Sequence, residues 1–251
     1  HRLGHYDRTR NQPDVSGTSR LSGALARGLL SPRQCIQAAE DQIQRPIWEF
    51  PDNAFSWINE LIWRDFYQHL LVGFPRLSKN RAFRTETEAL VWRNLPAEID
   101  AWKAGRTGIP IVDAGMRELK ATGWMHNRVR MIVAQFLTKN LLCDWRIGEA
   151  HFMQFLVDSD LGANNGGWQW SASTGTDAAP YFRVFNPVSQ SETHDPQANY
   201  ISRWIPELLT IPVKKRHAPW SGSIPQGYTA PIVDLKTSRQ RAIDAFKDLK
   251  S

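Results

Sequence analysis

The sequence is poor in cysteine and lacks long apolar runs. Cys35 and Cys143 are the only cysteines in 251 residues, which is too few for a disulfide framework or a structural zinc site, so both are expected to be buried reduced thiols. A run of about 18 apolar residues, the length that a membrane-spanning helix needs, is missing, and no secretory leader is visible at His1. We therefore expect a soluble, cytoplasmic protein without membrane contact, and a piece of a longer polypeptide.

The motifs of hydrolytic and metal-dependent enzymes are also missing. The chain contains no H-E-x-x-H helix, no P-loop and no G-x-S-x-G elbow. His126 has no second histidine or cysteine at ligand spacing, which favours a structural or surface residue over a metal ligand. Ser19 has no visible partner base, and Asp158 with Asp160 could bind a cation or pair with Arg130. The sequence thus predicts neither ordinary hydrolysis nor a metal centre.

Tryptophan and basic residues are plentiful. The chain has 11 tryptophans, and each buried indole needs an apolar environment and an acceptor for its N–H group. The formal net charge is +6 at pH 7, and a positive surface field concentrates phosphates around a protein. The composition therefore predicts an aromatic core and is compatible with a nucleic-acid partner.

Apolar residues recur at helical spacing over almost the whole chain, and no stretch alternates with the period of a strand. This pattern predicts an all-α, multi-helical protein, with residues 1–251 forming one domain because no repeat or linker divides them. Asp52 is placed to cap a helix that ends near Gly73, and the apolar stripe of this helix would be Phe55, Ile58, Ile62, Phe66 and Leu70. Ser31 and Pro32 begin another helix, and further helices are expected at 111–121, 125–142, 149–157, 198–204 and 238–249.

The segment from Asp158 to Trp168 interrupts this pattern. It combines two acids, two amides and three glycines in eleven residues. Such a composition predicts tight turns and exposed backbone.

Hydroxyl groups and a guanidinium lie close together from Thr18 to Ser22. Free N–H groups at a helix start, hydroxyl donors and the Arg20 cation would together make a phosphate site. A simple serine or threonine N-cap explains the same residues. The pentapeptide alone leaves both interpretations open.

Trp57, Glu60, Trp63 and Tyr67 are spaced three, three and four residues apart and therefore share one helix face. An acid between two indoles suits a pocket that stacks a flat ring and hydrogen-bonds its edge. An interface helix with an exposed glutamate accounts for the stripe equally well.

Residues 124–131 place amide, guanidinium and thioether groups at a helix start. Asn127, Arg130, Met131 and Ala134 fall on one face of this helix. Such a face could contact the edge of a base, and Arg128 could contact a phosphate.

Taken in order, these segments resemble the photolyase/cryptochrome family over nearly the whole chain. The motifs that carry the resemblance are Tyr6, Thr18–Ser22, Asn59–Tyr67, Trp124–Arg128 and Asp158–Asp177. Several long motifs in one order are far more specific than a single short pattern. The chain is identified as a member of that family, most similar to class I cyclobutane pyrimidine dimer photolyases, with the family's N-terminal α/β antenna domain absent.

The resemblance implies that the helical domain holds a bent FAD, active as FADH⁻. The hydroxyl residues would hold its diphosphate, and Asn164 would face N5 of the flavin. Arg130 and Asp158 are expected to form an ion pair, which lowers the cost of burying either charge. The implied cofactor contacts are Tyr6, Thr18, Ser19, Arg20, Leu21, Ser22, Trp57, Glu60, Trp124, Asn127, Arg130, Asp158, Asp160 and Asn164.

The resemblance also implies UV-damaged DNA as the partner. A pyrimidine dimer pairs and stacks poorly, so flipping it into a pocket costs less than flipping normal bases. An electron from excited FADH⁻ would open the cyclobutane ring and then return, with Glu60 hydrogen-bonded to the pyrimidine that accepts it. The implied residues are Glu60, Trp63, Asn127, Met131 and Trp170 for the dimer pocket, of which Glu60, Asn127 and Met131 take part in the chemistry, and Arg10, Arg64, Tyr67 and Arg128 for the DNA strand.

Trp168, Trp145 and Trp92 match the indole chain through which the family relays electrons from the surface to oxidised flavin. Ordinary core packing would explain each indole singly. An antenna chromophore, a folate or a deazaflavin, is expected mainly on the absent N-terminal domain, and the protein is expected to be a monomer. Gly162 and Ala198 depart from the family pattern, which affects the expected geometry of their loops.

A cryptochrome is the main alternative, because this signalling photoreceptor shares the fold and FAD but does not repair DNA. Glu60, Asn127, Met131 and Asn164 together resemble the dimer-repair group and favour repair. A (6-4) photolyase would offer two histidines near positions 126–131, where only His126 is present. A helical nucleic-acid-binding module without a cofactor leaves the flavin motif unexplained.

Overall fold

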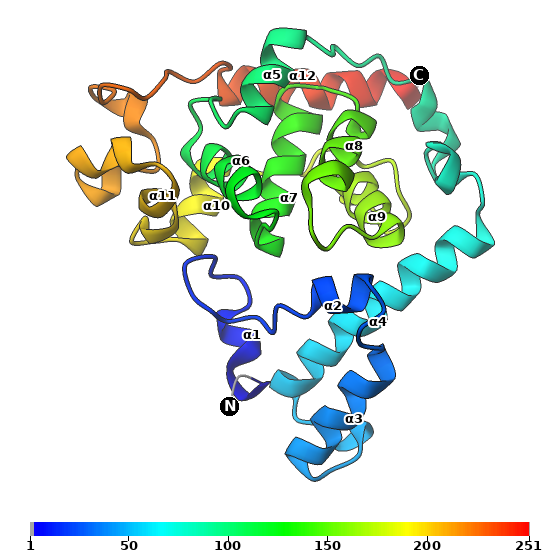
Figure 1. Cartoon of the computed structure of the whole chain (residues 1–251). Coiled ribbons are helices and arrows are strands. Elements are labelled where there is room, and N and C mark those ends of the chain that lie inside the picture. Colours follow the sequence, from blue (N-terminus) through cyan, green and yellow to red (C-terminus); the bar gives the residue numbers. More distant parts are fainter. Residues whose placement is uncertain (1–2, 251) are drawn as a thin grey trace.

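The computed structural model describes residues 3–250 and shows a helical protein with no β-strand in that range (Figure 1). The all-α prediction is therefore confirmed. None of the helices in the described part of the chain is long and apolar enough to cross a membrane. The α-helices are α1 Tyr6–Thr9, α2 Ser22–Ala26, α3 Pro32–Ile43, α4 Asp52–Gly73, α5 Pro96–Lys103, α6 Pro110–Thr122, α7 Asn127–Gln135, α8 Trp145–Phe155, α9 Leu161–Ala172, α10 Pro187–His194, α11 Asn199–Trp204 and α12 Leu235–Lys247.

The apolar side chains gather in two clusters. The larger one is built mainly by α6, α7, α8, α9 and α11, and its largest fully buried side chains include Trp102, Trp145 and Trp168. The smaller one joins α3 to the first half of α4 through Ala39, Ala54, Trp57, Ile58 and Leu61. In Figure 1, α1 to α4 lie on one side of the molecule and α5 to α12 on the other. The smaller apolar cluster thus holds the N-terminal helices together on the side opposite the larger apolar cluster.

Helix α4 differs from its prediction in two respects. Pro51 occupies the N-cap position without a side-chain hydrogen bond, so Asp52 is the first helical residue and not the cap. Phe55 and Ile62 are 42% and 49% exposed, because the buried face is turned toward α3. The predicted core stripe was therefore wrong at Phe55 and Ile62, whereas Ile58 is fully buried and Phe66 and Leu70 are half-buried.

The glycine-rich segment is also different from its prediction. It forms α9, and its N-cap is Asp160, whose carboxylate accepts a hydrogen bond from the Ala163 N–H at 3.0 Å. A Cβ on Gly166 would lie 2.1 Å from the Tyr67 ring of α4, and one on Gly148 of α8 would lie 2.1 Å from the Trp168 ring. These glycines allow close helix packing, which is why the segment is helical despite its composition.

Other boundaries agree more closely with the sequence. Ser31 and Gln34 form a capping box at the start of α3, and Gly123 ends α6 in the left-handed conformation with φ 69°. The helix expected at 125–142 ends as an α-helix at Gln135 and continues as a π-helical turn over Phe136–Asn140. At the departure noted above, Ala198 has φ 52°, a left-handed conformation that favours glycine.

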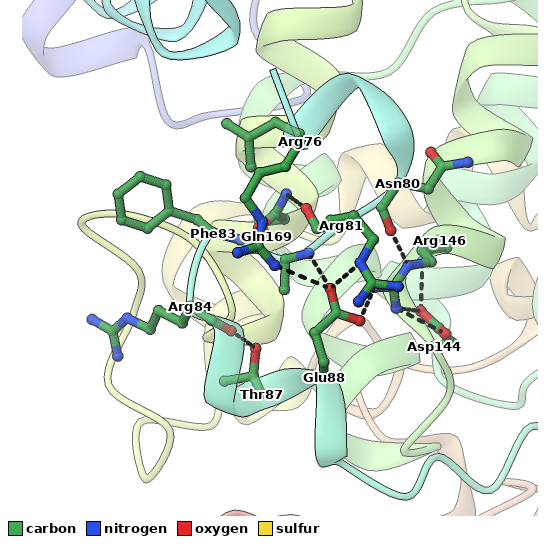
Figure 2. Close-up of polar contacts among 12 residues, drawn as sticks. Arg76, Asn80, Arg81, Phe83, Arg84, Thr87, Glu88, Asp144, Arg146 and Gln169 are labelled. Atoms are coloured by element: carbon green, nitrogen blue, oxygen red, sulfur yellow. Dashed lines mark hydrogen bonds and ion pairs between the residues drawn. The ribbon is translucent and has the colours of Figure 1, made fainter. Parts of the chain in front are cut away.

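The connection from α4 to α5 is fixed by Glu88 (Figure 2). Its carboxylate lies 2.8 Å from the Arg146 guanidinium of α8 and 3.4 Å from that of Arg81. Gln169 of α9 accepts a hydrogen bond from the Phe83 N–H at 2.8 Å. These contacts attach the segment that leads to Trp92 to α8 and α9, as Figure 2 shows.

We expect Gly166→Ala to lower the free energy of unfolding by about 1–3 kcal/mol, because the new methyl group overlaps the Tyr67 ring. Gly167→Ala is the matched control. No atom lies within 4 Å of the position of its Cβ, so it should be neutral or stabilising by up to about 1 kcal/mol. Urea denaturation measures both, and equal effects of the two substitutions would contradict the packing argument.

Candidate functional site

Three cavities share lining residues between the N-terminal helices and α7 with α9, and we call them together the central cleft. Their volumes are about 270, 210 and 160 Å³. Asn127, Arg130 and Asp158 line all three, and Tyr6 and Glu60 line the two larger ones. The structure therefore brings residues from α1, α4, α7 and the α8–α9 turn to one site.

The hydroxyl-rich segment lines one wall of the central cleft. Thr18, Ser19, Leu21 and Ser22 border both larger cavities. The Trp57 indole donates a hydrogen bond to Ser19 Oγ at 3.3 Å, which links this wall to α4. The helix that follows is short, since α2 has only five residues.

Arg20 and Trp124 close the same wall. Arg20 has a left-handed backbone, φ 56°, and its guanidinium lies 4.4 Å from the centre of the Trp124 ring. Both residues line one of the larger cavities. This cation–π contact holds the Arg20 charge beside the hydroxyl groups.

The predicted ion pair of Arg130 and Asp158 is present deeper in the cleft. Arg130 Nη2 lies 2.8 Å from the Asp158 carboxylate, whose side chain is 2% exposed. Arg130 Nε also donates to the Met125 carbonyl at 2.7 Å. Two charge-assisted contacts thus fix the guanidinium plane against the cleft.

Asp160 has a different role from Asp158. Besides capping α9, it accepts a hydrogen bond from Gln68 at 2.7 Å and pairs with Arg64 at 3.3 Å, both on α4. No group of acidic, histidine or cysteine side chains in residues 3–250 could hold a metal ion. The pairing with Arg130 that the sequence offered for both aspartates is present for Asp158, whereas Asp160 pairs with Arg64 instead.

Polar and aromatic side chains line the deep end of the cleft. Asn127, Met131, Asn164 and Trp168 border the cavity of about 160 Å³. The Asn164 amide donates to the Glu149 carbonyl at 3.0 Å, which fixes its orientation. A flat ligand at this end would meet amide, guanidinium and indole groups.

Glu149 was missed by sequence reasoning. Its side chain is buried and accepts a hydrogen bond from Asn165 at 2.8 Å, and burial raises its pKa. Gln169 donates to Asn165 at 2.8 Å. No sequence signal distinguishes this glutamate, because its burial depends on how α8 and α9 pack.

The rim of the cleft holds Tyr6, Arg10 and Glu60. Arg10 Nη1 lies 2.9 Å from Glu60 Oε1, and the Arg10 guanidinium lies 5.6 Å from the centre of the Tyr6 ring. Burial, and next the Glu60 carboxylate, raises the pKa of Tyr6 to about 12. Tyr6 is therefore a neutral hydroxyl group at neutral pH.

The other residues predicted to contact DNA do not line the three cavities, apart from Arg64, which borders the cavity of about 270 Å³. Trp63 is 37% exposed and its ring lies 6.2 Å from that of Tyr67. Arg128 donates to the Asn11 side chain at 2.8 Å, and the Trp170 ring lies 6.4 Å from that of Phe185. Trp63, Tyr67, Arg128 and Trp170 thus lie outside the three cavities.

The three relay tryptophans lie at different depths. Trp168 borders the deep cavity, Trp145 is fully buried and Trp92 is half-buried. The ring contacts of Trp168 are with Phe152 at 5.0 Å and with Trp102 at 6.0 Å between centroids. Sequence reasoning missed Trp102, because among 11 tryptophans nothing in its local sequence singles it out.

His126 is structural, as the sequence indicated. Its Nδ1 accepts a hydrogen bond from the Arg128 N–H at 3.1 Å and caps α7. Burial, and next the Arg130 charge, lowers its pKa to about 4. The ring is therefore neutral at neutral pH.

A family model described as the FAD binding domain of DNA photolyase matches residues 57–248. The chain belongs to this family of flavin-binding helical domains.

Two of its relatives are proteins named deoxyribodipyrimidine photo-lyase. The one from Escherichia coli K12 is 50% identical over 97% of the chain, and the one from Vibrio cholerae is 49% identical over 99%. These matches cover 52% and 53% of the relatives, so the chain spans about half of their length. The resemblance seen in the sequence is confirmed.

Solved structures share the fold. The crystal structure of a class III photolyase from Agrobacterium tumefaciens has a TM-score of 0.93 and 40% identity, with 99% of the chain and 53% of that structure covered. A Synechocystis cryptochrome has a TM-score of 0.88 and 36% identity, with 97% and 52% covered. Both a photolyase and a cryptochrome are therefore among the structural neighbours.

Removing the guanidinium of Arg130 should be strongly destabilising. We expect Arg130→Met to lower the free energy of unfolding by about 3 kcal/mol, because it leaves the buried Asp158 carboxylate without its cation. Combining it with Asp158→Asn should recover part of this loss. Additive losses in urea denaturation of the four proteins would show that the two side chains do not act as a pair.

The stabilising contribution of His126 should be lost as the pH is lowered from about 6.5 to about 4, because the unfolded state then binds a proton at His126 that the folded state does not. This histidine contributes at most about 3 kcal/mol. In His126→Gln, the decrease in unfolding free energy over this range should be smaller. The exposed His69, replaced in His69→Gln, is the matched control for the loss of one histidine.

Proposed function

We propose that this chain is the FAD- and DNA-binding part of a light-driven lyase that repairs cyclobutane pyrimidine dimers in DNA. The observation that carries the proposal is the convergence of Glu60, Asn127, Arg130 and Asp158 on one cleft. The names and identities of the photolyase relatives support it. A dimer-repair enzyme needs both a flavin site and a base-sized site that share a wall.

The cleft fits FAD at both ends. The hydroxyls of Thr18, Ser19 and Ser22 with the nearby Arg20 charge match the oxygens of a diphosphate. At the deep end, Arg130 and Asn164 offer donors to the polar edge of a flavin, and the buried Asp158 balances the Arg130 charge. Tyr6, Leu21, Trp57 and Trp124 would enclose the cofactor, and Asp160 would act through its cap on α9.

The part of the cleft that is lined by α4 and α7 is proposed to receive the flipped-out dimer. Glu60 and Asn127 border the cleft, and Met131 lies one helical turn after Asn127. Trp63 and Trp170 would flank the lesion from outside the cavities. A cofactor bound in its reduced form would act as a one-electron donor to this site after excitation by light.

Glu60 would stabilise negative charge on the pyrimidine that receives the electron. A hydrogen bond aimed at developing charge acts as an oxyanion-hole donor does, provided that one of the two partners carries a proton. Asn127 would hold the edge of a base by its amide, and Met131 would fill the space beside it. These side chains need not move far, because α4 and α7 already face each other across the cleft.

Basic side chains around the cleft are proposed to hold the DNA strand. Arg10, Arg64 and Arg128 would contact phosphates, with Tyr67 beside them. In the structure each of these arginines already has a protein partner, namely Glu60, Asp160 and Asn11. DNA binding would therefore exchange protein contacts for phosphate contacts.

Trp168, Trp145 and Trp92 are proposed to relay electrons to oxidised flavin. Trp168 borders the cleft, Trp145 is fully buried and Trp92 is half-buried, which supports a path between the cleft and the surface. An antenna chromophore, a folate or a deazaflavin, would bind mainly outside this chain, and a monomer would suffice for repair because every proposed residue lies in one chain.

A signalling cryptochrome is the second candidate, and the similarity to the Synechocystis cryptochrome favours it. It would use the same flavin site without the dimer wall. Glu60, Asn127 and Met131 are the residues that separate the two candidates.

The decisive experiment is repair of a thymine-dimer oligonucleotide by the reduced, flavin-loaded protein under blue or near-UV light. We expect the absorbance of thymine at about 260 nm to recover in the light, because splitting the dimer restores two conjugated rings. Glu60→Ala or Asn127→Ala should reduce the rate at least about tenfold, by analogy with the loss of one oxyanion-hole donor.

Two controls are needed. A sample kept in the dark should show no repair. The Asp65→Asn variant, which changes an exposed residue of α4, should repair the dimer at the wild-type rate. Flavin photoreduction without repair would contradict the dimer-repair proposal and favour the cryptochrome function.

A further inference from the structure

The rim of the central cleft is tied together by two adjacent residues. Arg10 pairs with Glu60 of α4 at 2.9 Å, and Asn11 accepts hydrogen bonds from Arg128 of α7 at 2.8 and 3.2 Å. One short segment after α1 thus contacts both walls of the cleft. Both contacts involve the same cavity, which Arg10, Asn11 and Glu60 line.

Positive charge exceeds negative charge at this rim. Burial, and next the charge of Arg10, lowers the pKa of Arg128, so the two guanidiniums lie close enough to repel each other. Arg20 adds a third cation on the same cavity, whereas Glu60 is the carboxylate that Arg10 contacts. Such a rim favours a phosphate diester, which carries one negative charge and can accept two parallel N–H donors from arginine.

The Arg10–Glu60 pair is open to exchange. The two side chains are 33% and 35% exposed, and ion pairs of this exposure contribute little to stability. Its separation therefore costs little when a phosphate supplies an equivalent partner. The ion pair also affects what Glu60 can bind. Its carboxylate borders the cleft, but Oε1 is engaged by Arg10 as long as the pair is formed.

We propose that Arg10 is a positioning residue that makes Glu60 available in response to DNA. In the DNA-free protein, Arg10 holds Glu60 at the rim. When DNA binds, a backbone phosphate replaces Glu60 as the partner of the Arg10 guanidinium. The released Glu60 carboxylate then turns to the base in the cleft. This inference rests on the proposed function, since it assigns a partner to Glu60. Its consequence is that Glu60 becomes an effective hydrogen-bond partner only when a DNA strand lies across the rim.

The test is a double-mutant cycle on DNA affinity, measured by fluorescence anisotropy with an undamaged, fluorescein-labelled oligonucleotide. This probe contacts the rim without a dimer in the cleft. Glu60→Gln removes the competitor for Arg10 and should tighten binding about threefold, the equilibrium effect of an exposed ion pair. In the Arg10→Gln background this gain should disappear.

Asp65→Asn is the matched control, because it removes an equal charge from the same helix, and the ion pair of this 57% exposed carboxylate is with Arg64 at 4.0 Å and not with Arg10. The small effect of Asp65→Asn on DNA affinity should be the same in the wild-type and the Arg10→Gln backgrounds. It is subtracted from the effect of Glu60→Gln to give the gain that is due to the ion pair. Arg10→Lys should keep the salt dependence of binding, whereas Arg10→Gln should lower its slope by about one phosphate contact. Thermal unfolding of each variant identifies any that do not fold.

A gain from Glu60→Gln that persists in the Arg10→Gln background would overturn the proposal, since it would report charge removal alone. Absence of any gain would overturn it as well. Failure of the proposed function has a different result, because a thymine-dimer oligonucleotide would then bind no better than the undamaged one and would not be repaired, while the cycle would still show the coupling. A protein that binds neither oligonucleotide would refute both.

Discussion

The contact between α4 and α9 depends on glycine. At Gly166 the α9 backbone approaches the Tyr67 ring so closely that no side chain fits, and at Gly162 a Cβ would lie 3.0 Å from the Gln68 side chain. This approach brings the smaller apolar cluster to the larger one and leaves the central cleft between them. It also places Asp160 within reach of Arg64 and Gln68, so the start of α9 is attached to α4 by charge as well as by packing. The cleft thus has its width because α9 lacks side chains where it contacts Tyr67 and Gln68 of α4.

The two less exposed carboxylates in the cleft, Asp158 and Asp160, are hydrogen-bonded more completely than the one at its rim. Asp158, almost fully buried, accepts two hydrogen bonds from one guanidinium. Asp160, at 13% exposure, is shared between an amide, a guanidinium and a backbone N–H group. Glu60 at the rim has an exposed ion pair. Desolvation explains this order, because a buried charge needs full compensation and an exposed one does not.

Much of the fold could be predicted from the sequence, because helical periodicity and local capping signals act over a few residues. The Ser31 capping box and the Gly123 end of α6 are examples. The predictions failed where tertiary packing decided the outcome. Phe55 and Ile62 are apolar at helical spacing, yet they face outward because α3 packs on the neighbouring face. The glycines of α9 indicated a turn. In the structure they allow α9 to pack closely on α4, which cannot be predicted without knowing the partner helix.

The site was predicted in the same uneven way. The Arg130–Asp158 pair followed from family motifs, and the cleft brings together Tyr6, Ser19, Trp57 and Glu60 from segments far apart in sequence. Glu149 and Trp102 could not be found, because each is defined by its burial and not by its neighbours in the chain. Roles for the individual residues in binding FAD or DNA stay predictions until the experiments above are made.

The segment that crosses the rim has one more consequence. Helix α1 buries no residue, and the segment after it is attached by polar contacts to α4, α7 and α11, the last through Asp14 and Asn199 at 3.1 Å. Local opening of this segment would expose the buried Pro13 but would leave the residues of both apolar clusters packed. A cofactor could then enter or leave without unfolding of the protein, so its residence time and the thermal stability of the chain are separate properties that evolution can adjust independently.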